Sequence, residues 1–336
     1  MGQNTSISGI LQAAVAMTAV GTLTAVSATV SRYPVYGGQA VRYAVAAVIL
    51  LGVARLRGPR PGPRARWEWP LLAALAATGL AGFNVCIVEG TRYTSPATIG
   101  TVVGSVPVVL AVVAPLMERR RPAARIVAAA AVVTLGAALA NGLGGGSLPG
   151  LLLALGALAG EVCFSLLALP LLPRLGAVRV SAYSAAAAVP MLLAAGLVVD
   201  GGSVLRTPTW GETAGLGYLA LVVTAGAFIA WYDALGRIGA DRAGLFAGLI
   251  PVSAVATTMV LGLRSPGMAE FAGALLVGLG VLVGLKRSAE RPLAVAAPAH
   301  HHDPAHDEEG HQDHAHDDQY PEDRRFVAEQ AADQGL

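Results

Sequence analysis

Ten apolar stretches, each long enough to cross a lipid bilayer as a helix, occupy most of residues 8–286. A hydrocarbon core of roughly 30 Å is crossed by about 20 residues of α-helix. The ten stretches cover residues 8–29, 37–56, 68–88, 97–117, 123–141, 149–170, 177–199, 211–232, 242–263 and 267–286. The sequence therefore predicts an all-α integral membrane protein with ten transmembrane helices.

Composition supports this class, because 54% of the residues are hydrophobic and only 13% are charged, whereas soluble domains carry roughly 25% charged residues. The charges are distributed unevenly along the chain. Residues 1–286 contain 19 Lys and Arg against 9 Asp and Glu, while residues 287–336 contain 4 against 12. The basic residues of the first part lie in short loops beside helix ends, which indicates membrane orientation and not binding of nucleic acid. The expected partners are the bilayer and a small-molecule solute.

The basic residues also predict which side of the membrane each loop faces. With each Lys and Arg assigned to its loop or helix end, sixteen fall on the side of the N-terminus and four on the opposite side. The sixteen are Arg55, Arg57, Arg60, Arg64, Arg66, Arg119, Arg120, Arg121, Arg125, Arg174, Arg179, Arg237, Arg242, Lys286, Arg287 and Arg291, and the four are Arg32, Arg92, Arg206 and Arg264. Cytoplasmic loops carry the excess of basic residues. We therefore expect a multi-pass protein of the cell membrane with both termini in the cytoplasm and residues 142–148 and 200–210 outside.

The second half of the chain repeats the first at a constant offset of 144 residues. The offset relates Glu89 to Asp233, Val106-Pro107-Val108 to Ile250-Pro251-Val252, and Pro122 to Pro266. Chance matching between helices rich in Ala, Gly and Val is the alternative explanation. Five helices per repeat is an odd number, so the second copy enters the membrane in the opposite orientation, as in many secondary transporters. We expect one five-helix repeat over residues 8–141, an inverted second repeat over 149–286, and a tail over 287–336.

Several motifs in the two repeats are similar to those of one transporter family. They are Glu89-Gly-Thr-Arg-Tyr-Thr-Ser-Pro-Ala97, Val106-Pro107-Val108 and Leu116-Met-Glu-Arg-Arg-Arg-Pro122, with second copies at Ala230–Ala240 and Ile250–Val252. These motifs resemble those of the EamA-type branch of the drug/metabolite transporter superfamily. The resemblance implies a ten-helix fold of two inverted five-helix repeats that moves small organic solutes, often as an exporter. It is almost silent on the identity of the solute.

Few ionisable residues lie at membrane depth, and each is costly unless it faces a cavity or a partner. Glu161 is the clearest of them, because it lies near the middle of the sixth predicted helix in a run without other charges. We expect it to be the polar centre of the translocation site, either as a proton-titrating coupling residue or as the counter-charge for a cationic group on the solute. The structural alternative is a fixed ion pair with Arg42, which lies in the outer third of the second helix. Arg42 could instead pair with Glu89 at the outer end of the third helix.

Other polar residues and prolines are candidates for the pathway. Glu89 and its repeat mate Asp233 are predicted at opposite faces of the membrane and are gate candidates, the alternative being carboxylates that are simply solvated at the interface. Pro107 and Pro251 are predicted in the middle of their helices, where each removes a backbone hydrogen bond and kinks the helix. Such kinks border a transport pathway or serve packing alone. The remaining candidates, which could equally be packing or interfacial residues, are Asn84, Trp231 and Tyr232.

All seven histidines lie in the tail, among many carboxylates. They are His300, His301, His302, His306, His311, His314 and His316. His and carboxylate ligands suit divalent ions such as zinc, nickel or cobalt, but the spacing is irregular, and low hydrophobicity with high charge predicts disorder. We therefore expect loose binding of divalent metal at the tail and no other cofactor. An exporter of divalent metal that uses the tail is the alternative function within transport.

Other functional classes lack the residues that they need. An enzyme within the membrane requires a nucleophile, a base or metal ligands held together, and the predicted helices contain no His and only two isolated cysteines, Cys86 and Cys163. The sequence also lacks a phosphate-binding Gly-Lys-Ser/Thr loop, so it does not encode direct use of ATP. Together with the resemblance to EamA-type transporters, this implies a secondary transporter, and not an enzyme, that exports small organic metabolites or drugs by alternating access. A membrane receptor or scaffold without transport is the alternative, and assembly into homodimers is left open.

Overall fold

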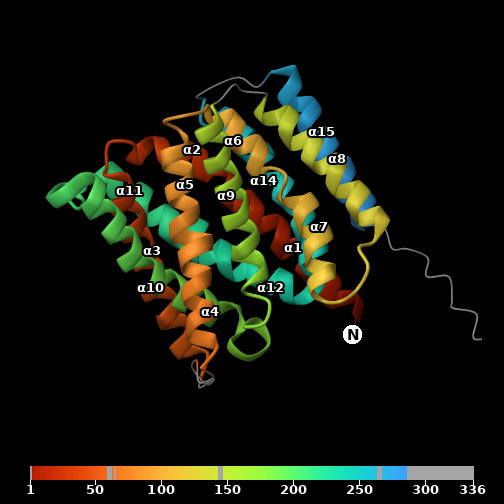
Figure 1. Cartoon of the computed structure of the whole chain (residues 1–336), viewed down its shortest axis with the longest axis horizontal. Helices are drawn as coiled ribbons and strands as arrows, with labels where there is room; N and C mark the ends of the chain where they lie inside the picture. The colour runs from red at the N-terminus through yellow and green to blue at the C-terminus, as the bar shows by residue number, and fades with distance from the viewer. Residues whose placement is uncertain (1, 59–62, 64–65, 143–146, 263–266, 286–336) are drawn as a thin grey trace, which may run out of the picture. The chain divides into compact units, whose positions relative to one another are not determined.

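The computed structural model describes residues 2–58, 63, 66–142, 147–262 and 267–285. These residues form helices and no strand. Ten helical stretches among them are long and apolar enough to cross a membrane, which confirms the predicted all-α fold with ten membrane-spanning helices. We number these stretches spans 1 to 10 in chain order, and Figure 1 shows how they pack side by side.

Some spans are single helices, and others are built from two or three helical segments. Spans 1 to 5 comprise α1 (Gly2–Gly21) with α2 (Leu23–Ser27); α3 (Val35–Leu56); α4 (Glu68–Leu75), η2 (Ala76–Gly82) and α5 (Phe83–Gly90); α6 (Pro96–Val103) with α7 (Val106–Met117); and α8 (Ala124–Asn141). Spans 6 to 10 comprise α9 (Leu148–Leu166); α10 (Leu172–Asp200); α11 (Trp210–Tyr218), η4 (Leu219–Gly226) and α12 (Ala227–Ile238); α13 (Ala240–Ala243), η5 (Gly244–Gly248) and α14 (Leu249–Val260); and α15 (Met268–Leu285). The short 3₁₀ turns η1 (Ala28–Val30) and η3 (Gly201–Ser203) lie at the ends of spans 1 and 7.

Successive spans run in opposite directions, so their connections gather at two ends of the bundle. The odd end carries the connections after odd-numbered spans, among them residues 91–95 and 204–209. The even end carries the start of α1 and the connections after even-numbered spans, among them residues 118–123 and 167–171. In Figure 1 the odd end lies towards the top and the even end towards the bottom.

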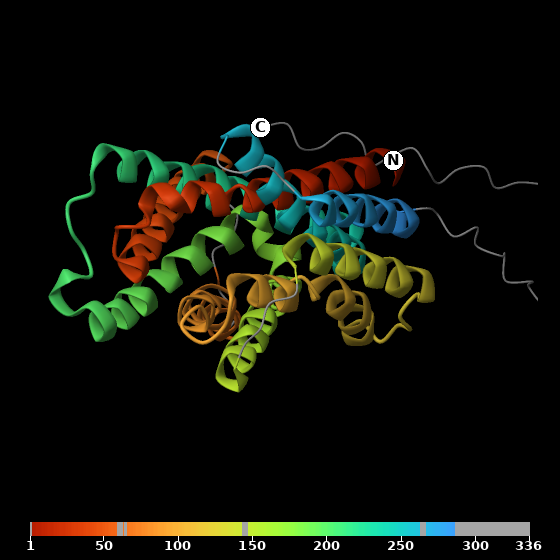
Figure 2. The ribbon, with the colours of Figure 1, turned by 90° about the horizontal axis from the view of Figure 1, so that it is seen from above.

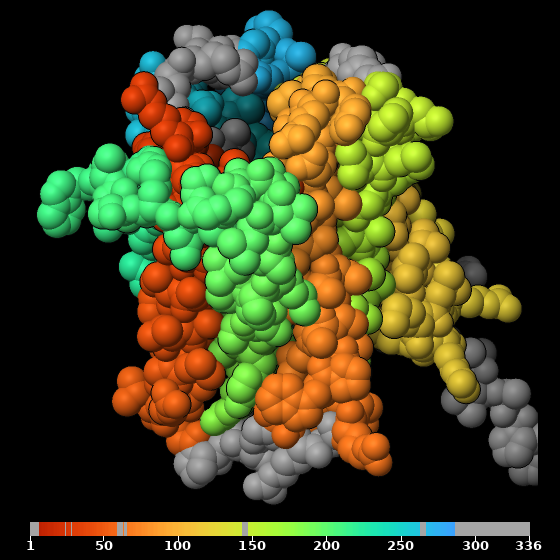
Figure 3. All heavy atoms as spheres, turned by 60° about the vertical axis from the view of Figure 1, so that its left-hand side comes forward, coloured from red at the N-terminus to blue at the C-terminus, as the bar shows by residue number. Residues whose placement is uncertain are grey.

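The two halves of the chain contact each other in a reciprocal pattern. Span 3 packs on span 6 and span 8 packs on span 1; span 4 also packs on span 6, as span 9 does on span 1. Two further contacts join a span to its own repeat mate, α3 with α10 and α8 with α15. Figures 1 and 2 show α8 beside α15, and Figure 3 shows α10 between α3 and the third span. This reciprocity is the pattern expected of two inverted five-span repeats related by a pseudo-two-fold axis.

The contact between α8 and α15 depends on glycine. A Cβ atom at Gly273 would lie 2.6 Å from the carbonyl oxygen of Gly136 and 2.7 Å from the amide nitrogen of Ala140. A Cβ atom at Gly136 would in turn lie 2.8 Å from the carbonyl oxygen of Gly273. Small residues of this kind let membrane helices approach closely, because no hydrophobic force drives helices together within lipid.

Both repeats depart from regular α-helix at corresponding places. Span 3 contains the π-helical segment η2, and span 8 contains the π-helical segment η4 at nearly the same offset of the repeat. Spans 4 and 9 are each interrupted, between α6 and α7 in one and through the 3₁₀ segment η5 in the other. π-Helical turns occur frequently at functional sites. These corresponding irregularities therefore indicate that the functional site lies among spans 3, 4, 8 and 9.

Pro107 and Pro251 lie near the middle of spans 4 and 9, as predicted, but neither lies in the interior of an uninterrupted helix. Pro107 is the second residue of α7 and Pro251 is the third residue of α14. In the first turn of a helix the missing N–H has no helical partner to lose, so proline is well tolerated there. Each proline therefore follows an interruption of its span and begins a new helical segment.

Candidate functional site

Glu161 lies on the wall of a pocket of about 230 Å³ between spans 3, 4, 6 and 9. The other lining residues include Ile87, Thr91, Val103, Val106, Ile250 and Pro251, so the walls are mostly apolar. Within the part of the chain that the structure describes, no hydrogen bond or ion pair reaches the Glu161 carboxylate. Pro251 thus shares the pocket with Glu161, whereas Pro107 lies one residue beyond its wall.

Arg42 lines a second pocket, of about 120 Å³, beside η1 and the start of α3. Only 5% of the Arg42 surface is exposed. Its Nε donates to Thr224 Oγ1 at 2.6 Å and its Nη1 donates to Gln39 Oε1 at 3.2 Å. The guanidinium carbon lies 5.4 Å from the centroid of the Tyr43 ring. Among the described residues, no carboxylate is close enough to form an ion pair with Arg42.

A cluster of four aromatic rings occupies the interior of the bundle. The rings belong to Tyr43, Phe164, Phe228 and Tyr232. The centroid of Phe228 is 6.3 Å from that of Tyr43 and 4.8 Å from that of Phe164. The Phe164 and Tyr232 centroids are 4.9 Å apart. These tilted contacts between spans 2, 6 and 8 are the arrangement that aromatic rings prefer.

Two residues of the aromatic cluster lie close in sequence to residues of the two pockets. Tyr43 lies directly beside Arg42 in α3, and Phe164 follows Glu161 by one turn in α9. Asn84 joins span 3 to the same cluster, because its Nδ2 donates to the Tyr43 hydroxyl at 3.2 Å. Arg42 and Asn84 thus share Tyr43 as an aromatic neighbour, whereas Glu161 lies one turn from Phe164 of the same cluster.

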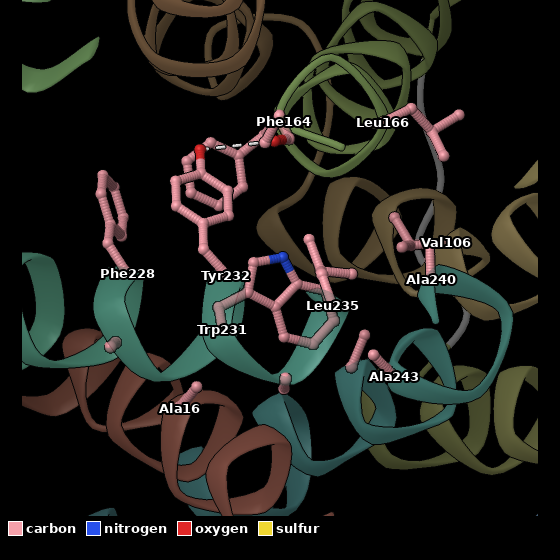
Figure 4. Close-up of a cluster of buried hydrophobic side chains, with 14 of the residues drawn as sticks. Ala16, Val106, Phe164, Leu166, Phe228, Trp231, Tyr232, Leu235, Ala240 and Ala243 are labelled. Atoms are coloured by element: carbon pink, nitrogen blue, oxygen red, sulfur yellow. Dashed lines mark hydrogen bonds between the residues drawn. The ribbon is translucent and has the colours of Figure 1, made fainter. Parts of the chain in front are cut away.

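Trp231 and Tyr232 project from α12 towards α9, as Figure 4 shows. The Tyr232 hydroxyl donates to the carbonyl oxygen of Phe164 at 3.4 Å, and Trp231 Nε1 donates to Ser165 Oγ at 3.2 Å. Each of the two side chains is 1% exposed. In this structure they hold span 8 against span 6, and neither borders the two pockets described above.

Neither of the two ion pairs considered for Arg42 is formed. Glu89 instead accepts a hydrogen bond from the Tyr36 hydroxyl at 3.0 Å and pairs with Arg92 at 3.3 Å. Glu161 faces its own pocket without a cation among the described residues. The physical reason is that the guanidinium of Arg42 turns towards η4, where a hydroxyl group and not a carboxylate accepts its proton.

Asp233 and Glu89, the two gate candidates, lie towards opposite ends of the bundle. Asp233 Oδ2 accepts a hydrogen bond from Gln12 Nε2 at 2.9 Å and pairs with Arg237 at 3.3 Å. Each carboxylate thus has an arginine one turn further along the chain and a neutral partner from span 1 or 2. The two arginines occupy nearly corresponding places in the repeats and the neutral partners do not, and the role of the two carboxylates as gates stays a prediction.

Two ion pairs join the repeats at the even end, and the sequence patterns did not predict them. Arg120 Nη1 lies 3.1 Å from Asp241 Oδ2, and Arg174 donates two hydrogen bonds to the carboxylate of Glu68. Glu68 is 0% exposed and Asp241 is 4% exposed. The hydrogen bond to Glu118, together with that to Asp241, raises the pKa of Arg120 above its usual value. The only sequence signal was the presence of acids beside the arginine-rich connections.

At the odd end, the ion pairs among the described residues form within one repeat. Arg206 pairs there with Glu212 of the following helix and lies 4.9 Å from the centroid of the Tyr33 ring, and Arg92 pairs with Glu89. The hydrogen bond that Arg206 donates to the Glu212 carboxylate raises the pKa of Arg206. Every ion pair that links one repeat to the other, within the described ranges, lies at the even end. Both pockets, in contrast, include residues of connections at the odd end.

The histidines of the tail, His300 to His316, lie outside the described residues. The interpretation of the tail as a loose binder of divalent metal therefore stays a prediction. In the described parts of the membrane body, no group of three or more His, Cys, Asp and Glu side chains is arranged to hold a metal ion.

Comparison with known proteins identifies both repeats. The model of the EamA-like transporter family matches residues 7–142 and again residues 148–285. The uncharacterized transporter YetK of Bacillus subtilis (strain 168) is 25% identical over 279 residues, which cover 81% of this chain and 83% of YetK. A crystal structure of a protein that is 18% identical superposes with a TM-score of 0.71 over 85% of this chain and 97% of its own. At that identity the superposition shows a shared fold.

Proposed function

Because the chain belongs to the EamA-like transporter family, we propose that it exports small organic solutes across the cell membrane by alternating access. Membership of the family and the similarity to YetK make it a membrane transporter and not an enzyme. The class of solute, the direction of movement and the mechanism are the proposed part.

The observation that carries the proposal is the surrounding of Glu161. A carboxylate at membrane depth is costly unless it faces a cavity or a partner, and Glu161 has a pocket and no partner among the described residues. A group held in this way is available to a solute or to a proton. Glu161 is thus the proposed polar centre of translocation, whether it titrates during coupling or balances a cationic group of the solute.

The distribution of pockets and ion pairs supports an alternating mechanism. Two ion pairs close the even end between the repeats, while the two pockets approach the odd end. The arginine bias places the even end in the cytoplasm. In the proposed mechanism this arrangement represents a state closed to the cytoplasm, and the opposite state would require the pairs of Arg120 and Arg174 to break.

The experiment compares solutes that accumulate outside cells expressing the wild type, Glu161→Gln, Asp200→Asn or no protein. Glu161→Gln keeps the shape of the side chain and removes its charge. Asp200→Asn makes the same chemical change at the end of α10, where the residue borders neither pocket. Membrane insertion and abundance of each variant are measured in parallel.

We expect one or more organic solutes to accumulate outside cells that express the wild type or Asp200→Asn. The same solutes should remain at the background level with Glu161→Gln at equal abundance in the membrane. An identical solute profile for Glu161→Gln and the wild type would remove Glu161 from the mechanism. A wild-type profile equal to that of cells without the protein, under conditions of verified insertion, would contradict export.

A further inference from the structure

The pocket that contains Arg42 has a composition unlike that of the Glu161 pocket. Its lining consists of apolar residues, uncharged polar residues and one charged residue, the arginine. Ser31 and Pro34 lie at the odd end of this pocket, and Leu216 and Leu219 line it from span 8. From this composition we propose that the pocket binds the carboxylate of an organic monoanion. The proposal rests on the transport function above, since it names the chemical class of the solute.

Arg42 carries a positive charge that no neighbouring carboxylate balances among the described residues. A guanidinium stays protonated in proteins, and a buried charge is tolerated when it is paired or faces a cavity. The partners of Arg42 are a threonine hydroxyl, a glutamine oxygen and the Tyr43 ring, all of them neutral. No described residue therefore balances the positive charge of Arg42, although only 5% of the residue is exposed.

Arg42 also has N–H groups without a hydrogen-bond partner among the described residues. A guanidinium carries five N–H groups, and two of them have partners, Thr224 and Gln39. No hydrogen bond joins Nη2 to another described residue, and this atom is not fully enclosed by protein. The planar fork of Arg is suited to two parallel hydrogen bonds with a carboxylate. Arg42 therefore brings to the pocket wall hydrogen-bond donors that the described residues leave unused.

The guanidinium of Arg42 is held in one orientation by the protein itself, without a ligand. Thr224 belongs to the π-helical segment η4, and its hydroxyl donates to the carbonyl oxygen of Leu219 at 2.9 Å. With its own proton committed in this way, the Thr224 oxygen accepts the Nε proton of Arg42 at 2.6 Å. Thr224 is therefore a positioning residue, and the π-helical turn is what brings its hydroxyl to Arg42.

The charge balance favours a singly charged ligand. Arg206, whose guanidinium carbon lies 4.9 Å from the centroid of the Tyr33 ring on the pocket wall, is already neutralised by Glu212. One uncompensated cation in mostly apolar walls suits one carboxylate on an apolar body. A dianion such as a phosphate monoester would leave one negative charge without a partner, and burial of such a charge is costly.

The experiment measures equilibrium binding of sodium benzoate to the purified full-length protein in a chloride-free buffer at neutral pH. Benzoate carries one carboxylate on a compact apolar ring, and benzamide is its neutral counterpart of the same shape. The two ligands are titrated into the wild type, Arg42→Gln, Ser31→Trp and Ser203→Trp. Ser31→Trp obstructs the pocket and leaves Arg42 with its partners, whereas Ser203→Trp adds the same ring at an exposed serine outside the pocket.

The wild type and Ser203→Trp are expected to bind benzoate at least about tenfold more tightly than benzamide, a ratio that one charge-assisted hydrogen bond supports. Arg42→Gln and Ser31→Trp should abolish this preference. Equal binding of benzoate and benzamide by the wild type would overturn the proposal, as would full benzoate binding by folded Ser31→Trp. Displacement of benzoate by an equal concentration of sodium chloride would show an unselective anion site and would also overturn it.

The binding measurement does not depend on transport, so the two proposals can fail separately. Benzoate binding that requires an open Arg42 pocket, in a protein that exports no solute, would refute the transport function alone. Export that is sensitive to Glu161→Gln, in a protein without preference for benzoate, would refute the carboxylate site alone.

Discussion

The glycine contact between α8 and α15 allows a quantitative prediction. Replacement of Gly273 by Ala places a Cβ atom 2.6 Å from the carbonyl oxygen of Gly136 and 2.7 Å from the amide nitrogen of Ala140. Ordinary contact begins at 3.4 Å, so the two helices must separate by about 0.8 Å. Both obstructing atoms belong to the backbone, and no side-chain rotation relieves the collision. We therefore expect a packing cost near the upper end of the usual range for overpacking, about 3 kcal/mol.

The net effect is smaller, because Ala in place of Gly stabilises a helix by about 1 kcal/mol. Gly273→Ala should thus lower the free energy of unfolding by about 2 kcal/mol. Gly278 provides the control within α15, since a Cβ atom there meets nothing within 4 Å. Gly278→Ala gains the same helix propensity without the collision and should melt at or slightly above the wild-type temperature.

The assay is thermal unfolding of the purified variants in one detergent, followed by tryptophan fluorescence. The difference between the two variants isolates the collision, because the contribution of helix propensity is common to both. If Gly273→Ala and Gly278→Ala melted at the same temperature, α8 and α15 would not meet at these glycines. The reasoning from close approach would then fail.

Three further predictions concern the topology, the tail and the even end. In a cysteine-free background, Gly145→Cys should react with a membrane-impermeant maleimide added to intact cells; protection from the reagent would reverse the predicted orientation. Deletion of residues 299–318 should weaken zinc binding and leave the ten-span body folded and active, whereas complete loss of solute transport would assign the tail an essential role. Arg120→Gln leaves the buried Asp241 without its cation and should cost about 2 kcal/mol, against about 1 kcal/mol for Asp241→Asn, which leaves a half-exposed arginine in contact with water. Equal melting temperatures of these two variants would contradict that asymmetry.

The sequence predicted the number of membrane spans well, and it failed where an apolar run continued through a turn. The sixth helix was predicted to end at residue 170, but α9 ends at Leu166. The following residues Ala168 and Leu171 are 0% exposed. Hydropathy reports that a residue avoids water, and it does not distinguish a buried turn from a helix within lipid. Gly176, whose φ of 74° is not helical, then interrupts α10 just before the predicted start of the seventh helix at residue 177.

The site was predicted less completely, for a reason of geometry. The cost of an isolated carboxylate at membrane depth pointed to Glu161, and this residue lines a pocket. The partner of Arg42 could not be found in the same way, because Thr224 lies 182 residues away. It also lies in a π-helical turn, where the side chains no longer follow the 3.6-residue period on which sequence patterns depend. The inter-repeat pairs of Arg120 and Arg174 likewise depend on how distant connections meet.

The contacts between repeat mates have a geometric consequence for any cycle in which the two repeats exchange conformations. Under a two-fold operation, the contact of span 3 with span 6 becomes the contact of span 8 with span 1, so one can loosen while the other tightens. A contact between mates, α3 with α10 or α8 with α15, maps onto itself and has no counterpart with which to exchange. These two pairs can therefore keep the same geometry in both end states. In such a cycle the two pairs would serve as stationary pivots, and the backbone contact of glycines in α8 and α15 would leave one of them little room to slide.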